Sequence, residues 1–445
     1  YDASLTPQPD RSLAQSWEIP DPLNIIFSMR ENVQFHDGTP VNAEAVRLWV
    51  ERGKTLPVST ISGDLDAVGS VEETDAMTAA FRMDRPFSPL LWILGDRAGM
   101  MASPAVYDDF TEANSRSTPS GAGAFRFVEE ELDGPFVMEA NPNYWLPNAP
   151  SIEHITWFQG ALQTVGNVEG LLAGDYDIIF DASIEDFDRI TDAGFTLLRK
   201  STNFMFFWNV NTNLGPWGNP HARHAFNAGF DRIELNEIAY GGLHTPVEWG
   251  WLGPTTIYHD PDEKFWGLDP EAVRMHLNAG GLEDGFEFDM VVKAEDPLYV
   301  DPSLYAQASL AQFGITMNVV QKPSPDFWAG FYGEQDPAFM GGMSMRADIW
   351  QMLAWNLVAE GPHDHILPPD GDPEMQAALT KVTELFELEP RIEAMREANR
   401  IAESRSYQIK TIHNTSTVAH DPGLEFTFFG DAKPHFGLND IRWAT

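Results

Sequence analysis

The sequence contains no cysteine, so disulfide bonds, thiolate metal sites and cysteine nucleophiles are excluded. It also lacks any apolar run of the roughly 18 to 20 residues that a membrane-spanning helix needs. Tyr1 is not followed by the charged and then apolar segments of a secretory leader. A cysteine-free chain suits an exported protein, and we expect any export signal to lie outside this sequence.

Basic residues are scarce. Asp and Glu number 67 against 28 Lys and Arg, which gives a formal net charge of −39. The field of such a chain repels phosphate, which argues against nucleic acid and anionic membrane surfaces as partners. A solvated acidic surface, as in salt-adapted proteins, explains this charge without a cationic ligand.

Salt is therefore expected to stabilise the protein. Repulsion among the 39 excess negative charges disfavours the compact state. Dissolved ions screen this repulsion over about 10 Å at 0.1 M. The melting temperature should rise between low salt and about 1 M sodium chloride, which differential scanning fluorimetry can measure. A flat or falling curve would show that repulsion does not limit stability.

Sequence motifs of catalysis are missing as well. There is no Gly-x-Ser-x-Gly elbow, no phosphate loop, no complete dinucleotide fingerprint and no His-Glu-x-x-His. His221 and His224 share one face of a predicted helix, and His363 and His365 lie in a predicted loop. Either pair could ligate a metal, but surface and capping histidines are commoner. We expect no enzyme activity, no cofactor and no metal.

The chain of 445 residues is long enough for two or three domains. Its first part predicts paired strands and one helix. From about residue 151 strands and helices alternate, which predicts an α/β fold. Residues 204–210 are apolar at nearly every position, as in a strand buried on both faces. We expect helices at 222–240, 269–279, 302–313, 374–386 and 391–406.

The most informative stretch is residues 30–46. Val33 and Phe35 alternate with polar residues, which predicts a half-buried strand. Asp37-Gly38 predicts a turn, because glycine tolerates a positive φ. Asn42 is placed to cap the helix that follows.

This stretch closely resembles the segment that marks the family 5 extracellular solute-binding proteins of bacterial ABC importers, which capture peptides, nickel and oligosaccharides. Further segments resemble the same family in the same order. They are residues 13–18, 96–104, 141–145, 209–212 with 222–226 and 231–232, and 310–315.

The chain also departs from the family pattern. Gly121-Ala122-Gly123-Ala124-Phe125 stands where the family has Gly-Thr-Gly-Pro-(Phe/Tyr), and Gly166 stands where many members have arginine. These differences bear on the ligand and not on the fold. Only a dozen residues precede the Leu-Ala-x-Ser-Trp motif, where members have a few tens, so we expect a missing piece before Tyr1.

The resemblance implies an α/β fold of the two-lobed, type II (cluster C-like) periplasmic-binding-protein kind with an extra small α+β domain. The implied domains are residues 1–122 for the small domain of the base lobe, 123–232 and 416–445 for the base lobe, and 233–415 for the second lobe. The lobes would close on a ligand by a hinge. The protein would be a monomer in the periplasm or on the outer face of the membrane, and its partners would be a small-molecule or peptide ligand and an ABC permease.

The resemblance also implies that ligand contacts lie in residues 341–350, which follow a strand of the second lobe. Many peptide-binding members have Gly-Trp-x-x-Asp there, and the aspartate binds the N-terminal ammonium of the peptide. Here Arg346 stands near that place and Met343 replaces the tryptophan. Arginine suits a carboxylate or phosphate. The alternative is a structural bridge between Arg346 and Asp348. Ser344, Asp348 and Trp350 are the other candidate ligand contacts of this segment.

Other candidate contacts are an arginine and several aromatic residues. Arg97 would lie at the border of the cleft, unless it pairs with Asp96. Trp249 and Trp251 alternate in a loop bounded by glycine and proline, as in a platform for a ligand. Phe207, Trp208 and Trp328 are further candidates, although core packing explains Trp208 equally well. Aromatic faces bind sugars, rings and apolar side chains alike.

A peptide or peptide-like solute is the expected ligand. An oligosaccharide, a nickel chelate or an anionic organic solute are the alternatives, because the acid that binds an ammonium is missing. The competing class is a hydrolase that uses two carboxylates about 5 to 10 Å apart. Carboxylates are too numerous for the sequence to indicate such a pair.

Overall fold

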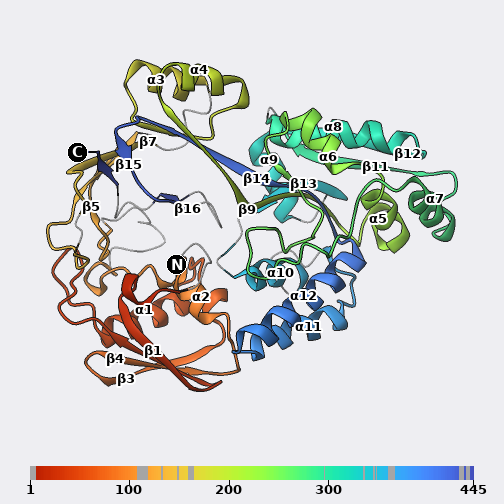
Figure 1. The fold of residues 1–445 in the computed structure, drawn as a ribbon. Helices are drawn as coiled ribbons and strands as arrows, with labels where there is room; N and C mark the ends of the chain where they lie inside the picture. Colours follow the sequence, from red (N-terminus) through yellow and green to blue (C-terminus); the bar gives the residue numbers. More distant parts are fainter. Residues whose placement is uncertain are drawn as a thin grey trace. The chain divides into compact units, whose positions relative to one another are not determined.

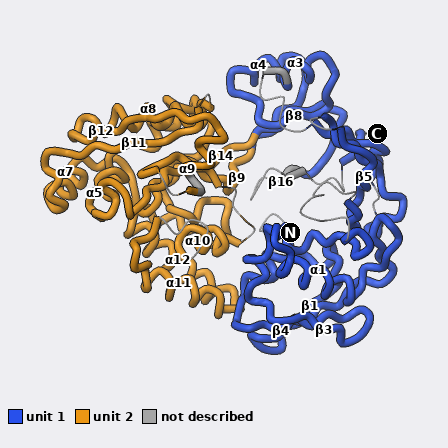
Figure 2. The backbone as a smooth tube through the Cα atoms, turned by 180° about the vertical axis from the view of Figure 1, so that it is seen from behind, with its two compact units in different colours: residues 1–199, 417–429, 434–445 blue, residues 200–416, 430–433 orange. Residues whose placement is uncertain are grey.

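A computed structural model describes most of the chain. The described residues are 7–107, 119–131, 134–147, 150–158, 165–294, 296–333, 336–343, 346, 348–358, 366–429, 435–436 and 441–444. They form two compact units (Figure 2). Unit 1 contains the described residues up to Arg199 and those from Thr417 onward, and unit 2 contains those of Lys200–Ser416.

A four-stranded antiparallel sheet begins unit 1 (Figure 1). Its order is β1-β2-β4-β3, with β1 (Ala14–Asp21), β2 (Asn24–Met29), β3 (Val68–Asp75) and β4 (Thr78–Met83). The helix α1 (Ala43–Thr55) packs against β3 and β4, and the short helix α2 (Leu90–Leu94) follows.

The stretch that was most informative in the sequence behaves largely as predicted. The Asn42 side chain accepts a hydrogen bond of 2.9 Å from the Ala45 amide and caps α1. Gly38 has a φ of +87°, so the predicted turn is confirmed. Val33 and Phe35 are both buried, but only an isolated bridge between Gln34 and Pro40 forms, in place of the predicted strand.

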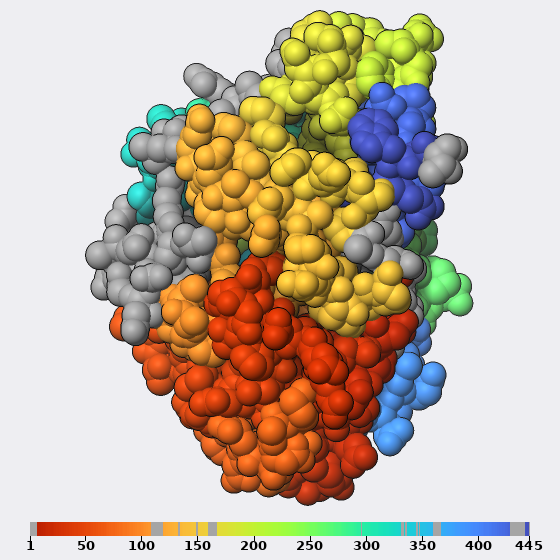
Figure 3. Space-filling model, turned by 90° about the vertical axis from the view of Figure 1, so that its left-hand side faces the viewer, coloured from red at the N-terminus to blue at the C-terminus, as the bar shows by residue number. Residues whose placement is uncertain are grey.

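The rest of unit 1 is built on a three-stranded antiparallel sheet of β5 (Phe125–Glu130), β6 (Pro135–Ala140) and β7 (His154–Phe158). Residues of the two sheets adjoin on one face, in red to orange and in amber (Figure 3). Hydrogen bonds connect these parts, among them those from the His36 amide to the Gly121 carbonyl (2.8 Å) and between His36 Nε2 and the Gly123 carbonyl (3.1 Å).

The remaining elements of unit 1 are short. They are α3 (Val165–Ala173), β8 (Ile178–Phe180), α4 (Phe187–Asp192), β15 (Leu424–Glu425), β16 (Phe428–Phe429), β17 (His435–Phe436) and β18 (Arg442–Trp443). β8 pairs with the end of β14 (Gln408–His420), through Val418 and Phe180.

Unit 2 is organised around one large sheet with the order β10-β14-β9-β13-β11-β12. Its further strands are β9 (Thr196–Val210), β10 (Thr245–Pro246), β11 (Phe286–Lys293), β12 (Ile315–Lys322) and β13 (Ala338–Met343). β11 runs parallel to β12 and β13, and β13 runs antiparallel to β9. The predicted α/β pattern is therefore confirmed.

Both faces of this sheet are covered by helices (Figure 1). On one face lie α5 (Pro220–Asn227), α6 (Arg232–Tyr240), α7 (Pro270–Ala279), α8 (Pro297–Ala311) and α9 (Ser324–Tyr332). On the other face lie α10 (Ile349–Leu357), α11 (Pro373–Glu384) and α12 (Leu388–Arg405). In the described part of the chain, no helix has both the length and the apolar character to cross a membrane.

The strand β9 shows why both faces are buried. Phe206, Trp208 and Val210 enter the core beneath α5 to α9, while Met205 and Phe207 enter the core beneath α10 to α12. Successive side chains of a strand point to opposite faces, so an apolar residue at every position supplies two cores. The prediction for residues 204–210 is thus confirmed.

The helix predicted at 222–240 is divided in two. The side chain of Asp231 accepts hydrogen bonds from the Ile233 and Glu234 amides and starts α6 as a new helix. Aspartate at such a position competes with the backbone of a continuing helix, which favours a break.

Among the described residues, the chain passes from one unit to the other within β9 and again within β14. Residues 200–232 belong to unit 2, whereas the family resemblance implied a place in the base lobe. The reason is that most of β9 lies in the large sheet, and α5 packs against it through Phe226, whose ring stacks on Trp208.

Candidate functional site

The candidate segment at 341–350 links the end of β13 to the start of α10 in unit 2. Asp348 caps α10, because its Oδ1 accepts a hydrogen bond of 2.9 Å from the Trp350 amide. Ser344 lies outside the described residues. The cap sets where the helix begins.

Asp348 is also one half of a buried ion pair. Its Oδ2 is bound by Nη2 of Arg391 from α12, and the two side chains are 0% and 1% exposed. Arg391 donates a second hydrogen bond, from Nη1 to the hydroxyl of Tyr258. Asp348 is therefore a buried connection between α10 and α12, and not the ligand contact that was predicted.

In the trio of Asp348, Arg391 and Tyr258, burial and the neighbouring charges act on the pKa values of the side chains. Burial alone would lower the pKa of Arg391, but the carboxylate of Asp348 raises it, so the guanidinium stays charged. Burial raises the pKa of the Tyr258 hydroxyl, which remains neutral and able to accept the bond from Arg391.

Arg346 is half-buried and lies over an aromatic ring of α10. Its guanidinium carbon is 5.1 Å from the ring centroid of Trp355, which is the distance of a cation–π contact. The sequence offered an ion pair between Arg346 and Asp348 as the alternative. In the structure, Asp348 pairs with Arg391 instead.

Met343 and Trp350 flank Arg346 in the chain and both pack on neighbouring helices. The Nε1 of Trp350 donates to the Leu379 carbonyl of α11 over 2.9 Å. The sulfur of Met343 accepts from Nδ2 of the buried Asn356 over 3.4 Å. Asp348 and Trp350 therefore lie at the start of α10, whereas Arg346 and Met343 contact Trp355 and Asn356 near its end.

Three of the aromatic candidates are core side chains. Trp208 and Trp251 are 0% exposed and Phe207 is 2% exposed. Nε1 of Trp208 donates to the hydroxyl of Ser303 over 3.0 Å, and Phe207 packs on Trp251 with centroids 6.2 Å apart. Phe207 and Trp208 lie on the apolar strand β9 and Trp251 lies after β10, and all three are buried in the two cores, so Trp251 adds no exposed ring to the platform predicted from Trp249 and Trp251.

Trp249 and Trp328 are only half-buried. Trp249 packs against His259, with centroids 5.0 Å apart, and Lys264 Nζ lies 5.4 Å from its ring centroid. Trp328 lies on α9 beside Phe327, with centroids 5.0 Å apart. These two rings keep partly exposed surface that a ligand can use.

Arg97 belongs to unit 1 and makes an ion pair there. Its Nη2 and Nε lie 3.0 Å and 3.1 Å from Oδ2 of Asp64, a buried carboxylate from the segment before β3. Asp96 was the partner expected from the sequence as the alternative, but Arg97 pairs with Asp64. The ion-pair partner of Arg97 therefore lies 33 positions earlier in the chain and is brought close by the fold.

Sequence reasoning missed Arg391, Tyr258 and Trp355. None of them falls in a motif, and Arg391 and Tyr258 lie far from residues 341–350 in the chain. The one available signal was the position of Arg391, which falls on the apolar side of the predicted helix 391–406. A charge buried there without a partner would be costly, so an acidic partner was to be expected.

Comparisons with known proteins agree with this architecture. The glutathione-binding protein GsiB of Pectobacterium atrosepticum is 26% identical over 320 residues, which are 69% of this chain and 60% of GsiB. Among solved structures, NikA from Brucella suis with Fe(III)-EDTA has a TM-score of 0.83 at 17% identity, with coverage of 98% of this chain and 92% of NikA. DppA from Helicobacter pylori with the peptide STSA has a TM-score of 0.81 at 18% identity, with coverage of 98% and 89%.

At these identities the solved structures show the fold alone, which is the predicted type II periplasmic-binding-protein fold. The model of the bacterial extracellular solute-binding proteins, family 5 Middle, matches residues 8–360, well over half of the chain. The chain therefore belongs to the family 5 bacterial extracellular solute-binding proteins.

Proposed function

We propose that this protein is an extracytoplasmic binding protein that captures a peptide or peptide-like solute and delivers it to an ABC importer. The observation that carries the proposal is the family match over residues 8–360. The two crossings within β9 and β14 support closure on a ligand by a hinge, as in periplasmic binding proteins. The protein works as a monomer without enzymatic activity.

We further propose that the ligand carries an anionic group that binds Arg346. The support is the position of Arg346 after β13 and its orientation by the Trp355 ring. The guanidinium offers a planar fork to a carboxylate or phosphate. A peptide carboxylate fits, as do the acidic groups of an anionic organic solute.

Met343, Trp350, Trp249 and Trp328 are partly exposed and would border the ligand in this proposal. Ser344, which lies outside the described residues, and Arg97 of unit 1 stay as further candidate contacts. Oligosaccharides and nickel chelates stay as alternative ligands, because aromatic surface accepts them equally well. A carboxylate-based hydrolase stays as the alternative class.

Native mass spectrometry of the protein purified from its own organism tests the function. We expect one solute per chain, released unchanged on denaturation and identified as a peptide or a related acid. Incubation with that solute should produce no new species. Catalytic turnover of the solute would support the hydrolase instead, and a neutral sugar would contradict the anionic ligand.

Replacing Arg346 with alanine is expected to weaken binding of that solute by about tenfold to a hundredfold. A hydrogen bond to a charged group contributes roughly 1.5 to 3 kcal/mol, which corresponds to a factor of this size. Arg346→Lys should recover only part of the affinity, because lysine cannot form a bidentate pair. Isothermal titration calorimetry measures the affinity of the wild type, Arg346→Ala and Arg346→Lys for this solute.

Arg274→Ala is the matched control. Arg274 is an exposed arginine of α7 that donates a hydrogen bond of 3.3 Å to the Pro270 carbonyl of its own helix. Its removal should leave the affinity unchanged, and the melting temperature of both variants should stay near that of the wild type. Equal affinity of wild type and Arg346→Ala would refute the role of Arg346.

A further inference from the structure

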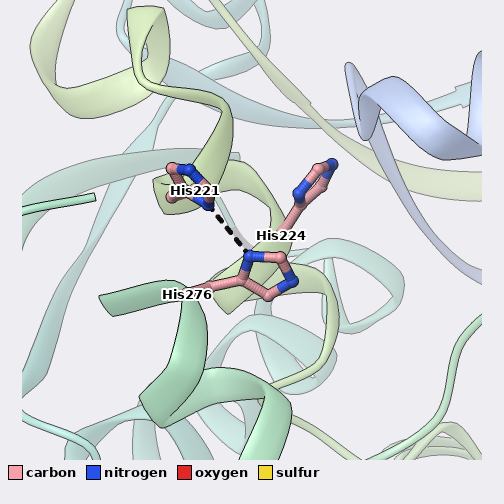
Figure 4. Close-up of side chains that lie close together, drawn as sticks. All are labelled: His221, His224 and His276. Atoms are coloured by element: carbon pink, nitrogen blue, oxygen red, sulfur yellow. Dashed lines mark hydrogen bonds between the residues drawn. The ribbon is translucent and has the colours of Figure 1, made fainter. Parts of the chain in front are cut away.

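Three histidines of unit 2 converge from two helices (Figure 4). His221 and His224 lie one turn apart on α5, and His276 comes from α7. One ring nitrogen from each lies within 4.8 Å of the other two. The Nδ1 atoms of His221 and His276 are only 3.1 Å apart. All three rings are half-buried, so they form a compact group of nitrogen donors that solvent can reach.

Close packing holds α5 and α7 in place around this group. Asn219 caps α5 by accepting a hydrogen bond of 3.0 Å from the His221 amide, and its Nδ2 donates to the Gly280 carbonyl after α7 over 2.9 Å. A Cβ on Gly280 would lie 2.8 Å from Cβ of His221, so only glycine permits this approach. The separation of His221 and His276 is therefore set by the backbone.

His224 is oriented by a third helix. Its Nε2 lies 3.0 Å from the Ser404 carbonyl of α12. A carbonyl oxygen only accepts hydrogen bonds, so Nε2 carries the proton and the lone pair of the neutral ring is on Nδ1. Histidines that bind metals typically donate their other ring nitrogen to a carbonyl or carboxylate in this way.

We propose that His221, His224 and His276 form a binding site for a divalent transition-metal ion of the zinc class. Imidazole nitrogen suits zinc, copper and nickel, and three histidines with a water molecule make an established zinc coordination. The metal replaces the proton that His221 and His276 share across their Nδ1 atoms. The net charge of −39 favours the approach of a cation.

The distances are compatible with this ion. Zinc–nitrogen bonds of about 2.0 to 2.1 Å place tetrahedral ligand nitrogens about 3.3 Å apart. The two Nδ1 atoms at 3.1 Å already approximate one edge of that tetrahedron. The third nitrogen has to approach by at most about 1.5 Å, which side-chain rotation can supply.

This metal site is separate from the residues proposed for the transported solute. The three histidines lie on α5 and α7 on one face of the large sheet, whereas Arg346, Met343 and Trp350 contact α10 and α11 on the other. The ion would join α5 to α7 and stabilise unit 2 by binding the folded state. The proposal does not depend on the proposed function.

Zinc uptake by chelator-treated protein tests the proposal, measured in competition with a chromophoric chelator. The variants are His276→Gln, His221→Gln and the double substitution, and the control is His154→Gln, which changes an exposed histidine of β7. We expect one ion per chain in the wild type and the control. Each single variant should bind zinc at least about tenfold more weakly. Mutation of a residue that only hydrogen-bonds to a metal ligand already weakens metal binding by about that factor.

Thermal unfolding with and without zinc provides the second measurement. Zinc should raise the melting temperature of the wild type and the control, and leave that of the double variant unchanged. Metal-free melting temperatures of the single variants that stay near the wild type show that the fold is intact. The proposal is overturned if the wild type takes up no zinc, or if the single variants bind it as tightly as the wild type does.

Discussion

Replacing Asp348 with alanine is expected to lower the free energy of unfolding by about 3 to 5 kcal/mol. The substitution removes the carboxylate that pairs with Arg391, and both side chains are almost completely buried. The guanidinium then stays buried with only part of its hydrogen bonds, which costs much more than losing an exposed ion pair. The cap of α10 is lost as well. Urea denaturation followed by tryptophan fluorescence measures the change.

Two further variants separate the ion pair from the cap. Asp269 caps α7 in the same manner but is exposed, so Asp269→Ala should cost only about 1 kcal/mol. Asp348→Asn keeps a good capping group and removes the charge. Its free energy of unfolding should therefore be much closer to that of Asp348→Ala than to that of the wild type. A loss for Asp348→Ala no larger than that for Asp269→Ala would show that the buried pair contributes little.

Acidification from about pH 6.5 to about pH 4 is expected to destabilise the protein through two buried histidines. Burial lowers the pKa of His244 and that of His413 from 6.5 to about 4, with a smaller contribution from His259 at His413. Between these values the unfolded chain binds protons that the folded protein does not, so stability falls as the pH falls. At 1.36 kcal/mol per pKa unit, each histidine contributes about 3 kcal/mol over this range.

The local structure explains why these rings resist protonation. Nδ1 of His244 accepts a hydrogen bond of 3.0 Å from the Thr415 amide, and a proton there would remove the acceptor. His413 is 1% exposed, and neither of its ring nitrogens has a hydrogen-bond partner among the described residues. A charge on either ring would be buried without compensation.

The test compares unfolding free energies at pH 6.5 and pH 4 in variants. His413→Leu removes one titrating group, so the loss of stability on acidification should shrink by roughly the contribution of one histidine. His154→Gln changes an exposed histidine and should lose as much stability on acidification as the wild type does. The many carboxylates affect all variants alike and cancel in the comparison. An unchanged acid response in His413→Leu would contradict the prediction.

The sequence alone determined the features that depend on neighbouring residues. The turn at Gly38, the cap by Asn42 and the doubly buried strand at 204–210 all follow from local chemistry and from the period of the apolar residues. The order of short motifs sufficed for the family and the fold. Helix boundaries were less well determined, since Asp231 divides a segment that the apolar pattern alone predicts to be continuous.

Only the tertiary structure decided which distant residues meet. Asp348 is bound by Arg391 and Tyr258 completes the trio, while His276 joins His221 and His224. These pairings link segments that are tens of residues apart, and their geometry depends on how helices pack on the large sheet. Composition and spacing contain no information on that packing. The physical reason is that a side chain's partner is chosen by distance in space and by the cost of burying an unpaired charge, which only the folded chain defines.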